Sequence, residues 1–282
     1  VLVGPEKKKV FFTEQFAGGN VLFEGLSDRI SRRDYFLRYL SLAALDTATL
    51  RIKRITELAG SGVLLSRFIG NSTLGRALVR GASSLLTPGA EWPGLFERWR
   101  PDAVFSTDAQ NEFDLQMLHE ARRRGIRTVA MVRSWDNLTA KGILRFVPDV
   151  LAVHNGIISR EAQTLHGVPA AHIRVIGIPH YDRYMRPAAT PWNEFCRRIG
   201  GDPSKKLLLY VPTGDRYLSP NTLDREIVET LDARLAAGYQ ILVRFPPADT
   251  VAGLGGIRSR NRIIFDAPSS TVKFGALTRD DD

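Results

Sequence analysis

The sequence predicts an α/β protein with two Rossmann-like lobes, the second of them incomplete. Three observations predict this fold class. Short apolar runs alternate with amphipathic stretches from residue 103 onward, the alternation restarts after a proline-rich stretch at residues 187–191, and it stops after three further strands. Strands that alternate with helices form parallel sheets with helices packed on their faces.

The composition is that of an ordinary globular protein, with 44% hydrophobic residues among 282. The only cysteine, Cys196, excludes an internal disulfide and fits a reducing compartment. The chain has 39 basic and 30 acidic residues. The resulting net charge of +9 favours anionic partners, among them an anionic membrane surface. No apolar run approaches the roughly 20 residues that span a bilayer. We therefore expect a cytoplasmic protein, with peripheral contact at the inner face of the membrane left open.

The first hundred residues are expected to contain two short strands and two helices. Val10–Phe12 and Val21–Phe23 are apolar runs separated by glycines, as in two strands joined by a turn. Apolar residues recur at helical spacing over Tyr35–Leu58, and Leu64–Leu86 is amphipathic. The polar side of the second helix is expected to consist of Arg67, Arg76 and Arg80. A pair of helices packed on the core and a membrane-surface contact through these arginines are both compatible with the pattern.

The N-terminal lobe, residues 1–186, is expected to contain a parallel sheet. Its strands are expected at residues 103–107, 128–132, 149–153 and 173–177, with helices at 112–124 and 155–165. Asn155 can cap the second helix, and Gly125 and Gly167 suit the ends of the two helices.

Residues 187–204 are expected to link the lobes, and residues 205–282 to form part of the C-terminal lobe. Strands are expected at 207–211, 240–244 and 262–265, with a helix that opens at residues 219–220. A parallel sheet of three strands leaves an edge and a face uncovered. We therefore expect the chain to be a fragment of a longer protein.

Ligands of open parallel sheets bind beyond the carboxyl ends of the strands, and polar residues gather there in this sequence. Asp108 and Gln110 follow the first strand, where either can contact an acceptor hydroxyl; the simpler alternative is that Asp108 or Asn111 caps the next helix. The loop after the second strand combines an aromatic ring, a carboxylate, an amide and a hydroxyl, which suits a sugar, although a capped loop with a docked tryptophan is the simpler alternative. These loop residues are Trp135, Asp136, Asn137 and Thr139.

Two further groups follow later strands. Gly177, His180 and Asp182 come after the last strand of the first lobe, where Gly177 allows a close backbone approach and His180 is a candidate base. In the second lobe, Thr213 and Gly214 can donate hydrogen bonds to a phosphate, and Arg244 can bind one, although an ion pair is the alternative for Arg244.

Several classes of site are excluded by missing patterns. The sequence has no Gly-x-Ser-x-Gly elbow, no His-Glu-x-x-His motif, no P-loop and no cysteine pair for zinc. The five histidines lack the spacing of metal ligands. We expect no metal and no resident cofactor. Basic residues are scattered through the predicted helices rather than interleaved with aromatics, which argues against a nucleic-acid partner.

Residues 103–184 resemble bacterial GT-B-fold glycosyltransferases of surface-carbohydrate synthesis, a group related to CDP-glycerol glycerophosphotransferase-like and UDP-N-acetylglucosamine 2-epimerase-like proteins. The resemblance is carried by the run Ser134–Thr139, by His154-Asn155, and by Gly177-Ile178-Pro179 with Tyr181-Asp182. Residues 243–247 resemble the Arg-His-Pro step of those families, with Phe245 in place of the histidine.

The resemblance implies a metal-independent glycosyltransferase whose first lobe holds the acceptor and whose second lobe holds a nucleotide-linked donor. The main donor-binding elements of the family come later than this chain extends, so we expect the fragment to be inactive alone. The expected catalytic residues are Asp136, Asp108 and His180. Expected substrate contacts are Gln110, Trp135, Asn137, Thr139, Gly177 and Asp182, and expected phosphate contacts are Thr213, Gly214 and Arg244. The alternatives are a CDP-glycerol-type glycerophosphotransferase and a sugar-nucleotide-binding or epimerase-like protein.

Overall fold

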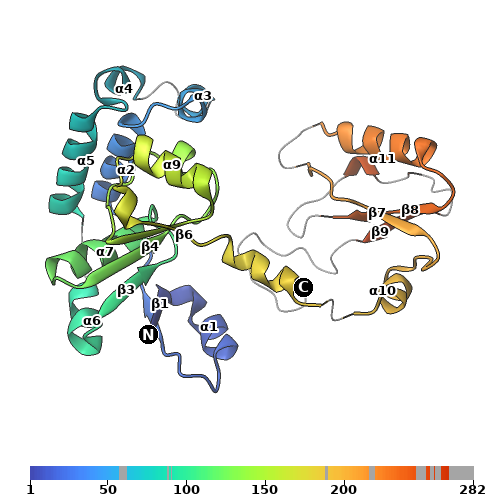
Figure 1. The fold of residues 1–282 in the computed structure, drawn as a ribbon, viewed down its shortest axis with the longest axis horizontal. Helices are drawn as coiled ribbons and strands as arrows, with labels where there is room; N and C mark the ends of the chain where they lie inside the picture. The colour runs from blue at the N-terminus through green and yellow to red at the C-terminus, as the bar shows by residue number, and fades with distance from the viewer. Residues whose placement is uncertain are drawn as a thin grey trace. The chain divides into compact units, whose positions relative to one another are not determined.

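The computed structural model describes residues 1–56, 62–87, 89, 91–187, 190–215, 220–245, 252–254, 257 and 262–266. The chain is an α/β protein with parallel sheets, and it divides into two compact units, Val1–Asp182 and Arg183–Asp282 (Figure 1).

The first unit is built on a four-stranded parallel sheet. Its strands are β3 (Ala103–Ser106), β4 (Arg127–Met131), β5 (Val150–Val153) and β6 (Ile173–Val175). Their order in the sheet is the order in the sequence, β3-β4-β5-β6, and every pair is parallel. The strands expected in this lobe are thereby confirmed, each to within two residues. Because all four strands run the same way, the loops that follow them emerge at one edge.

The helices between these strands begin and end where the sequence predicts. Helix α7 (Glu112–Arg123) is capped by Asn111, whose side chain accepts from the Phe113 amide at 2.9 Å. Asn155 caps α9 (Gly156–Thr164) by accepting from two amides of its first turn. Short helical turns form α8 (Asn137–Ala140), η2 (Ala170–His172) and η3 (Pro179–Met185). The apolar faces of α7 and α9 contribute Leu118 and Ile158 to the core of the unit.

The expectation for the N-terminal segment is wrong in one element. Residues 10–12 lie in α1 (Lys9–Gln15) rather than in a strand. The parallel pair is formed instead by β1 (Leu2–Pro5) and β2 (Phe23–Leu26), with η1 (Glu6–Lys8) between β1 and α1. Phe12 and Phe16 are four residues apart, the spacing of one helix face, and the Phe12 ring also stacks on Phe23 at 5.2 Å.

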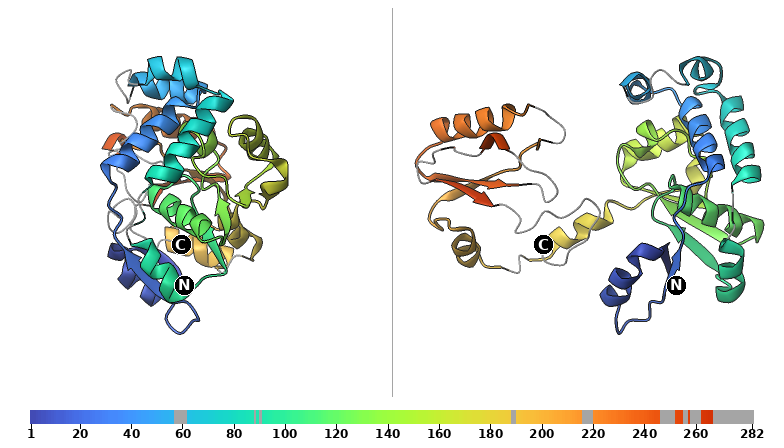
Figure 2. Two further views of the ribbon diagram at one scale, coloured as in Figure 1. Left: turned by 90° about the vertical axis from the view of Figure 1, so that its left-hand side faces the viewer. Right: turned by 180° about the vertical axis from the view of Figure 1, so that it is seen from behind.

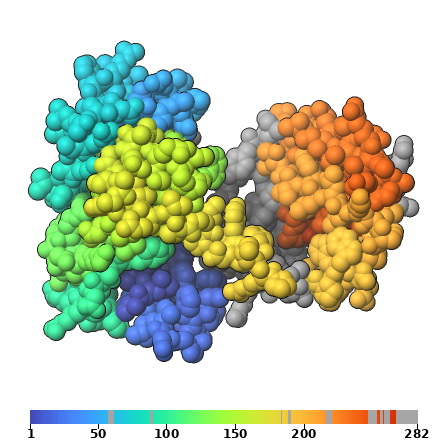
Figure 3. All heavy atoms as spheres, viewed as in Figure 1, coloured from blue at the N-terminus to red at the C-terminus, as the bar shows by residue number. Residues whose placement is uncertain are grey.

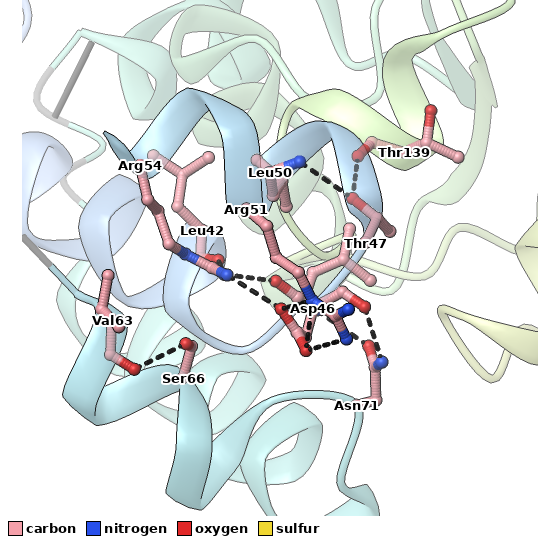
Figure 4. A network of polar contacts seen from close by, with 11 residues as sticks. Leu42, Asp46, Thr47, Leu50, Arg51, Arg54, Val63, Ser66, Asn71 and Thr139 are labelled. Atoms are coloured by element: carbon pink, nitrogen blue, oxygen red, sulfur yellow. Dashed lines mark hydrogen bonds and ion pairs between the residues drawn. The ribbon is translucent and has the colours of Figure 1, made fainter. Parts of the chain in front are cut away.

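The single helix expected over residues 35–58 is two helices, α2 (Arg32–Ala43) and α3 (Ala48–Thr56). The break falls at Asp46 and Thr47, whose side chains bond residues of α3 (Figure 4). Asp46 accepts from Arg51 at 2.7 Å and from Arg54 at 3.0 Å, and the Thr47 hydroxyl accepts from the Leu50 amide. Polar side chains that compete for backbone groups favour such interruptions.

Residues 63–86 likewise form two helices, α4 (Val63–Ile69) and α5 (Thr73–Leu86), and α6 (Trp92–Trp99) follows. The expectation that Arg76 and Arg80 form the solvent side of this region is wrong. Arg80 donates to the carbonyls of Leu144 at 3.0 Å and His166 at 2.5 Å, and Arg76 donates to Leu165. Burial lowers the pKa of Arg80 to about 10. The carbonyl oxygens offset the cost of placing these guanidinium groups inside.

His166 ties several segments of the first unit together. Its Nδ1 accepts from the Leu144 amide at 3.0 Å, so the proton must lie on Nε2, which donates to the Leu138 carbonyl at 2.8 Å. The ring is fully buried, and burial lowers its pKa to about 4. A second buried histidine, His119, bonds Ser83 at 3.0 Å and has a pKa lowered to about 4 by the same cause.

The second unit contains a three-stranded parallel sheet in the order β7-β8-β9. Its elements are α10 (Trp192–Ile199), β7 (Lys206–Tyr210), α11 (Leu223–Arg234), β8 (Tyr239–Arg244), η4 (Ala252–Leu254) and β9 (Ile263–Asp266). The stretch expected as a linker, residues 187–204, differs from that expectation because it contains α10, whose Cys196 is fully buried. The tail after Lys273 lies outside the described residues.

Among the helices that the structure describes, none combines the length and the apolar character needed to cross a bilayer.

The two buried histidines predict that acid destabilises the first unit. Unfolded histidines take up protons below about pH 6.5, whereas the folded ones stay neutral to about pH 4. The free energy of unfolding therefore falls as the pH drops between these values, by up to roughly 3 kcal/mol for each ring. Urea unfolding followed across this range measures the effect, with the exposed His180 replaced by Gln as the control. A free energy of unfolding that stays constant between about pH 7 and 5 would contradict the prediction.

Candidate functional site

A pocket of about 610 Å³ lies at the carboxyl ends of β3 and β4, and we call it the β3–β4 pocket. Its walls come from the segment after β3, the loop after β4, helices α2 and α3, and the N-terminal segment. Six cationic and four acidic side chains line it, so cations are in excess by two. They are Lys8, Arg38, Lys53, Arg133, Lys141 and Arg145, with Asp28, Asp108, Glu112 and Asp114.

Asp108 is a buried carboxylate shared by two cations. The chain leaves β3 in register with β4, because the Ala109 amide donates to the Met131 carbonyl at 2.9 Å. This places the Asp108 carboxylate 3.2 Å from Lys141 Nζ and 3.9 Å from Arg133 Nη1. Asp108 is only 4% exposed, and Lys141 is the closer and less exposed of its two cations.

Asp114 is the second carboxyl on this side of the pocket. The fully buried Ser106 hydroxyl donates to Asp114 Oδ1 at 3.0 Å and accepts from the Asp108 amide at 3.3 Å, so it connects the two acids. Burial raises the pKa of Asp114 to about 6; the Ser106 hydrogen bond opposes the shift and the nearby Asp108 charge adds to it. A carboxyl that titrates near neutrality in a polar pocket has the properties of a general acid or base.

Glu112 and Arg145 form a separate ion pair in the wall. Arg145 Nη2 donates to Glu112 Oε1 at 3.0 Å, and the Arg145 side chain is 4% exposed. Burial raises the pKa of Glu112 and lowers that of Arg145, and each group opposes the shift of the other. Arg145 Nη1 has no hydrogen-bond partner among the described residues. The wall thus holds a guanidinium with hydrogen-bonding capacity to spare.

The loop after β4 is anchored at two points, Thr139 and Gly142. Gln110 Nε2 donates to the Gly142 carbonyl at 2.8 Å, and the Thr47 hydroxyl donates to the Thr139 carbonyl at 2.6 Å. Gly142 has a φ of +85°, and a Cβ there would lie 2.7 Å from the Ser41 backbone, so only glycine fits. The close approach to α2 holds the neighbouring Lys141 toward Asp108.

The structure places the predicted residues of this loop at the same edge of the sheet, in the loop that carries Arg133 and Lys141, but outside the lining of the pocket. Trp135 is 75% exposed, so it is not a docked core residue. Asp136 stands at the N-cap of α8 without a side-chain capping bond. Asn137 is buried, with Nδ2 unpartnered among the described residues, and the Thr139 hydroxyl donates to the Asp136 carbonyl.

Gly177, His180 and Asp182 follow β6. Gly177 has a φ of +78°, which favours glycine, and His180 and Asp182 are exposed in η3. Because β6 lies two strands away from β4, these residues begin about 10 Å along the edge from the loop after β4. The structure therefore does not bring them into the β3–β4 pocket.

Thr213, Gly214 and Arg244 lie in the second unit, and their predicted phosphate donors already have partners. The amides of Thr213 and Gly214 donate to the two oxygens of Asp224 at 3.0 and 3.3 Å. Arg244 at the end of β8 pairs with Asp266 at the end of β9 at 2.6 Å. The ion-paired alternative for Arg244 is the one that the structure has.

The sequence predicted two residues of this pocket as site residues, Asp108 and Gln110. It did not predict Asp114, Glu112 or Arg145. Glu112 and Asp114 are ordinary acids of a helix first turn, and the sequence gives no sign that they face a cavity. Two acids two residues apart, directly after a polar strand end, are the signal that could have identified them.

Among the described residues, no group of three or more histidine, cysteine or acidic side chains is placed to hold a metal ion. Comparison of the sequence with models of protein families gave no match, and comparison with curated proteins gave none either.

The raised pKa predicts that Asp114→Asn stabilises the protein at neutral pH. A carboxyl whose folded pKa lies above its unfolded value of 3.8 favours folding below that value, and this contribution is lost as the pH rises through about 6. Asparagine keeps the acceptor for Ser106 and removes the charge. We expect the free energy of unfolding to rise by about 1–3 kcal/mol at neutral pH and to show no gain below about pH 4.

Chemical denaturation at both pH values measures this difference, with Asp136→Asn as the matched carboxylate outside the pocket. A loss of stability at neutral pH in the Asp114 variant would show that its charge is favourable in the folded state.

Proposed function

We propose that this chain is a GT-B-type glycosyltransferase, which moves a sugar from a nucleotide-linked donor to a surface-glycan acceptor held in the β3–β4 pocket. The observation that carries the proposal is the pair Asp108 and Asp114, joined by Ser106 at the carboxyl end of a parallel sheet. Sites of open parallel sheets lie at this position. The resemblance of residues 134–139 to surface-carbohydrate glycosyltransferases supports the same activity.

In the proposed reaction an acceptor hydroxyl attacks the anomeric carbon of the donor sugar. The new glycosidic bond forms as the bond between the sugar and the donor phosphate breaks, and the nucleotide leaves with that electron pair. Asp114 takes the proton of the hydroxyl, since its pKa of about 6 makes it ionised at neutral pH and more basic than an ordinary carboxylate. Asp108, fixed by Lys141, accepts a hydrogen bond from the acceptor.

The exposed Trp135 ring provides an apolar surface on which a sugar face can stack. Asp136, Asn137 and Thr139 belong to the same loop and are proposed as further acceptor contacts. Gly177, His180 and Asp182, farther along the edge, are proposed as contacts to more distant parts of the acceptor, with His180 as the alternative base.

The donor phosphates are proposed to bind at Thr213, Gly214 and Arg244 in the second unit. The amides of Thr213 and Gly214 now donate to Asp224, and Arg244 pairs with Asp266. Donor binding at these residues therefore requires exchange of a protein carboxylate for a phosphate, two anions with similar hydrogen-bond preferences.

A CDP-glycerol-type glycerophosphotransferase is a second candidate, favoured by the excess of cations in the β3–β4 pocket. An acceptor that carries phosphates would be held by such a pocket through charge, whereas a neutral sugar would not need it. A sugar-nucleotide-binding or epimerase-like role requires no acceptor at all.

Because the fragment is expected to be inactive alone, the test uses a longer chain that includes the expected donor-binding elements. Thermal shift of that chain with UDP-, GDP- and CDP-linked donors, followed by assay of nucleotide release with sugar and glycerol-phosphate acceptors, separates these functions. Stabilisation by a sugar nucleotide with acceptor-dependent release supports the glycosyltransferase. Preference for CDP-glycerol supports the second candidate, and the absence of any shift with all donors contradicts both.

The proposed base predicts the pH dependence of turnover. The ionised form of Asp114 is the active one, so kcat/KM of the longer chain should rise with pH through about 6 and level off above it. Asp114→Asn should lower kcat by about 100-fold or more and abolish this dependence. Ser106→Ala removes the hydrogen bond that lowers the pKa of Asp114, so the rise should move to higher pH.

Asp136→Asn serves as the comparison, because Asp136, like His180, is an alternative candidate for the base. A variant at Asp136 that loses the pH dependence, with Asp114→Asn retaining it, would transfer the role of base to Asp136.

A further inference from the structure

The helices α3, α4 and α5 present large apolar side chains to solvent. We call six of them the apolar helical face: Ile55, Leu64, Phe68, Leu74, Leu78 and Leu85, which are 59–85% exposed. Helices α3 and α4 lie at one end of the first unit and α5 runs down its side (Figures 1 and 2). Single exposed leucines are normal in proteins, but six large exposed apolar side chains on three consecutive helices indicate an interaction surface.

On α5 the exposed leucines form one continuous stripe. At 100° per residue, Leu74, Leu78 and Leu85 fall within about 40° of one another. Val79 and Ser83, on the opposite side, are buried, and Arg76 and Arg80 donate to carbonyls of the core. The helix is therefore amphipathic in the reverse of the usual sense, with arginines inward and leucines outward.

The segment that carries this face is strongly basic. Residues 29–87 contain ten arginines and lysines and three acids, which leaves +7 of the net +9 of the chain. Arg29, Arg32, Arg33, Arg51 and Arg67 are exposed. Of the acids that the structure describes in this segment, Asp34 is buried, and Asp46 is paired with Arg51 and Arg54. Asp46 therefore offsets the charge of Arg51 but not that of the other four exposed arginines.

The face is part of the folded unit. Arg54, 2% exposed, donates to the carbonyls of Leu42 and Leu45 and to Asp46, and Asn71 exchanges two hydrogen bonds with the Asp46 backbone (Figure 4). These bonds join the end of α2 to α3 and to the start of α5. Figure 3 shows α4 and α5 on the outer surface of the first unit. Presentation of the leucines thus costs no further ordering of the backbone.

We infer that the apolar helical face binds the surface of an anionic lipid bilayer. Leucine, isoleucine and phenylalanine side chains insert at the boundary between headgroups and acyl chains, while exposed arginines are attracted to anionic headgroups. A second copy of this chain would bring the same positive face against itself, and the two would repel. Charge therefore favours the bilayer over self-association. The inference is independent of the proposed catalytic activity.

Co-sedimentation with vesicles tests the inference on the whole chain. We expect binding to phosphatidylcholine vesicles that contain phosphatidylglycerol, weaker binding to phosphatidylcholine alone, and release by salt. The triple variant Leu74→Ser, Leu78→Ser and Leu85→Ser should lower partitioning by at least about tenfold, because each leucine loses apolar burial in the bilayer. Arg33→Gln with Arg67→Gln should weaken binding and flatten its salt dependence.

Matched controls lie in the second unit. Leu209→Ser with Val211→Ser, which are equally exposed, and Arg197→Gln with Arg198→Gln should leave vesicle binding unchanged. The single variant Leu85→Ser, at the most exposed leucine of the face, keeps the test usable if the triple variant unfolds, and we expect a severalfold loss. Equal binding of wild type and leucine variants overturns the inference. So does a wild-type dimer that the triple variant converts to a monomer, since the face would then belong to a second copy.

Discussion

Parallel pairing of neighbouring strands determines where chemistry can occur in this protein. Because β3, β4, β5 and β6 are adjacent in sequence and in the sheet, each connection returns to the same end before the next strand begins. The loops after β3 and β4 are therefore side by side at one edge. Asp108 comes from one loop and Lys141 from the other, and their ion pair depends on that adjacency. If β4 ran antiparallel to β3, the loop after β4 would emerge at the opposite edge and Lys141 could not reach Asp108.

The sequence predicted the strands and helix caps of this arrangement well, because those signals are local. Asn111 and Asn155 cap helices through their own side chains, and Gly125 takes the positive φ that ends a helix. The inward arginines of α5 were not predictable in this way. A helical pattern shows two faces but not which one faces the core, and Arg80 faces inward only because distant carbonyls of Leu144 and His166 meet it.

The residues of the candidate site also divide into those that local sequence signals predicted and those that they did not. Asp108 could be predicted because its place after a strand follows from strand order alone. The burial of Asp114 and the pairing of Glu112 with Arg145 depend on the walls that α2 and the loop before β5 provide. Helix α3 belongs to both surfaces of the first unit, since Lys53 lines the β3–β4 pocket and Ile55 points to solvent. A change in the position of α3 would therefore alter both the β3–β4 pocket and the apolar helical face.

Asp224 gives the second unit an unusual property. Its carboxylate accepts from the amides of Thr213 and Gly214, from the Tyr210 hydroxyl and from Asn221, and it is fully buried. A group tethered in this way acts at an effective concentration on the order of millimolar or higher. A free anion would be in competition with it, and only ligands with several contacts elsewhere would displace it. The Asp224 carboxylate would then lose its bonds to the Thr213 and Gly214 amides whenever such a ligand bound.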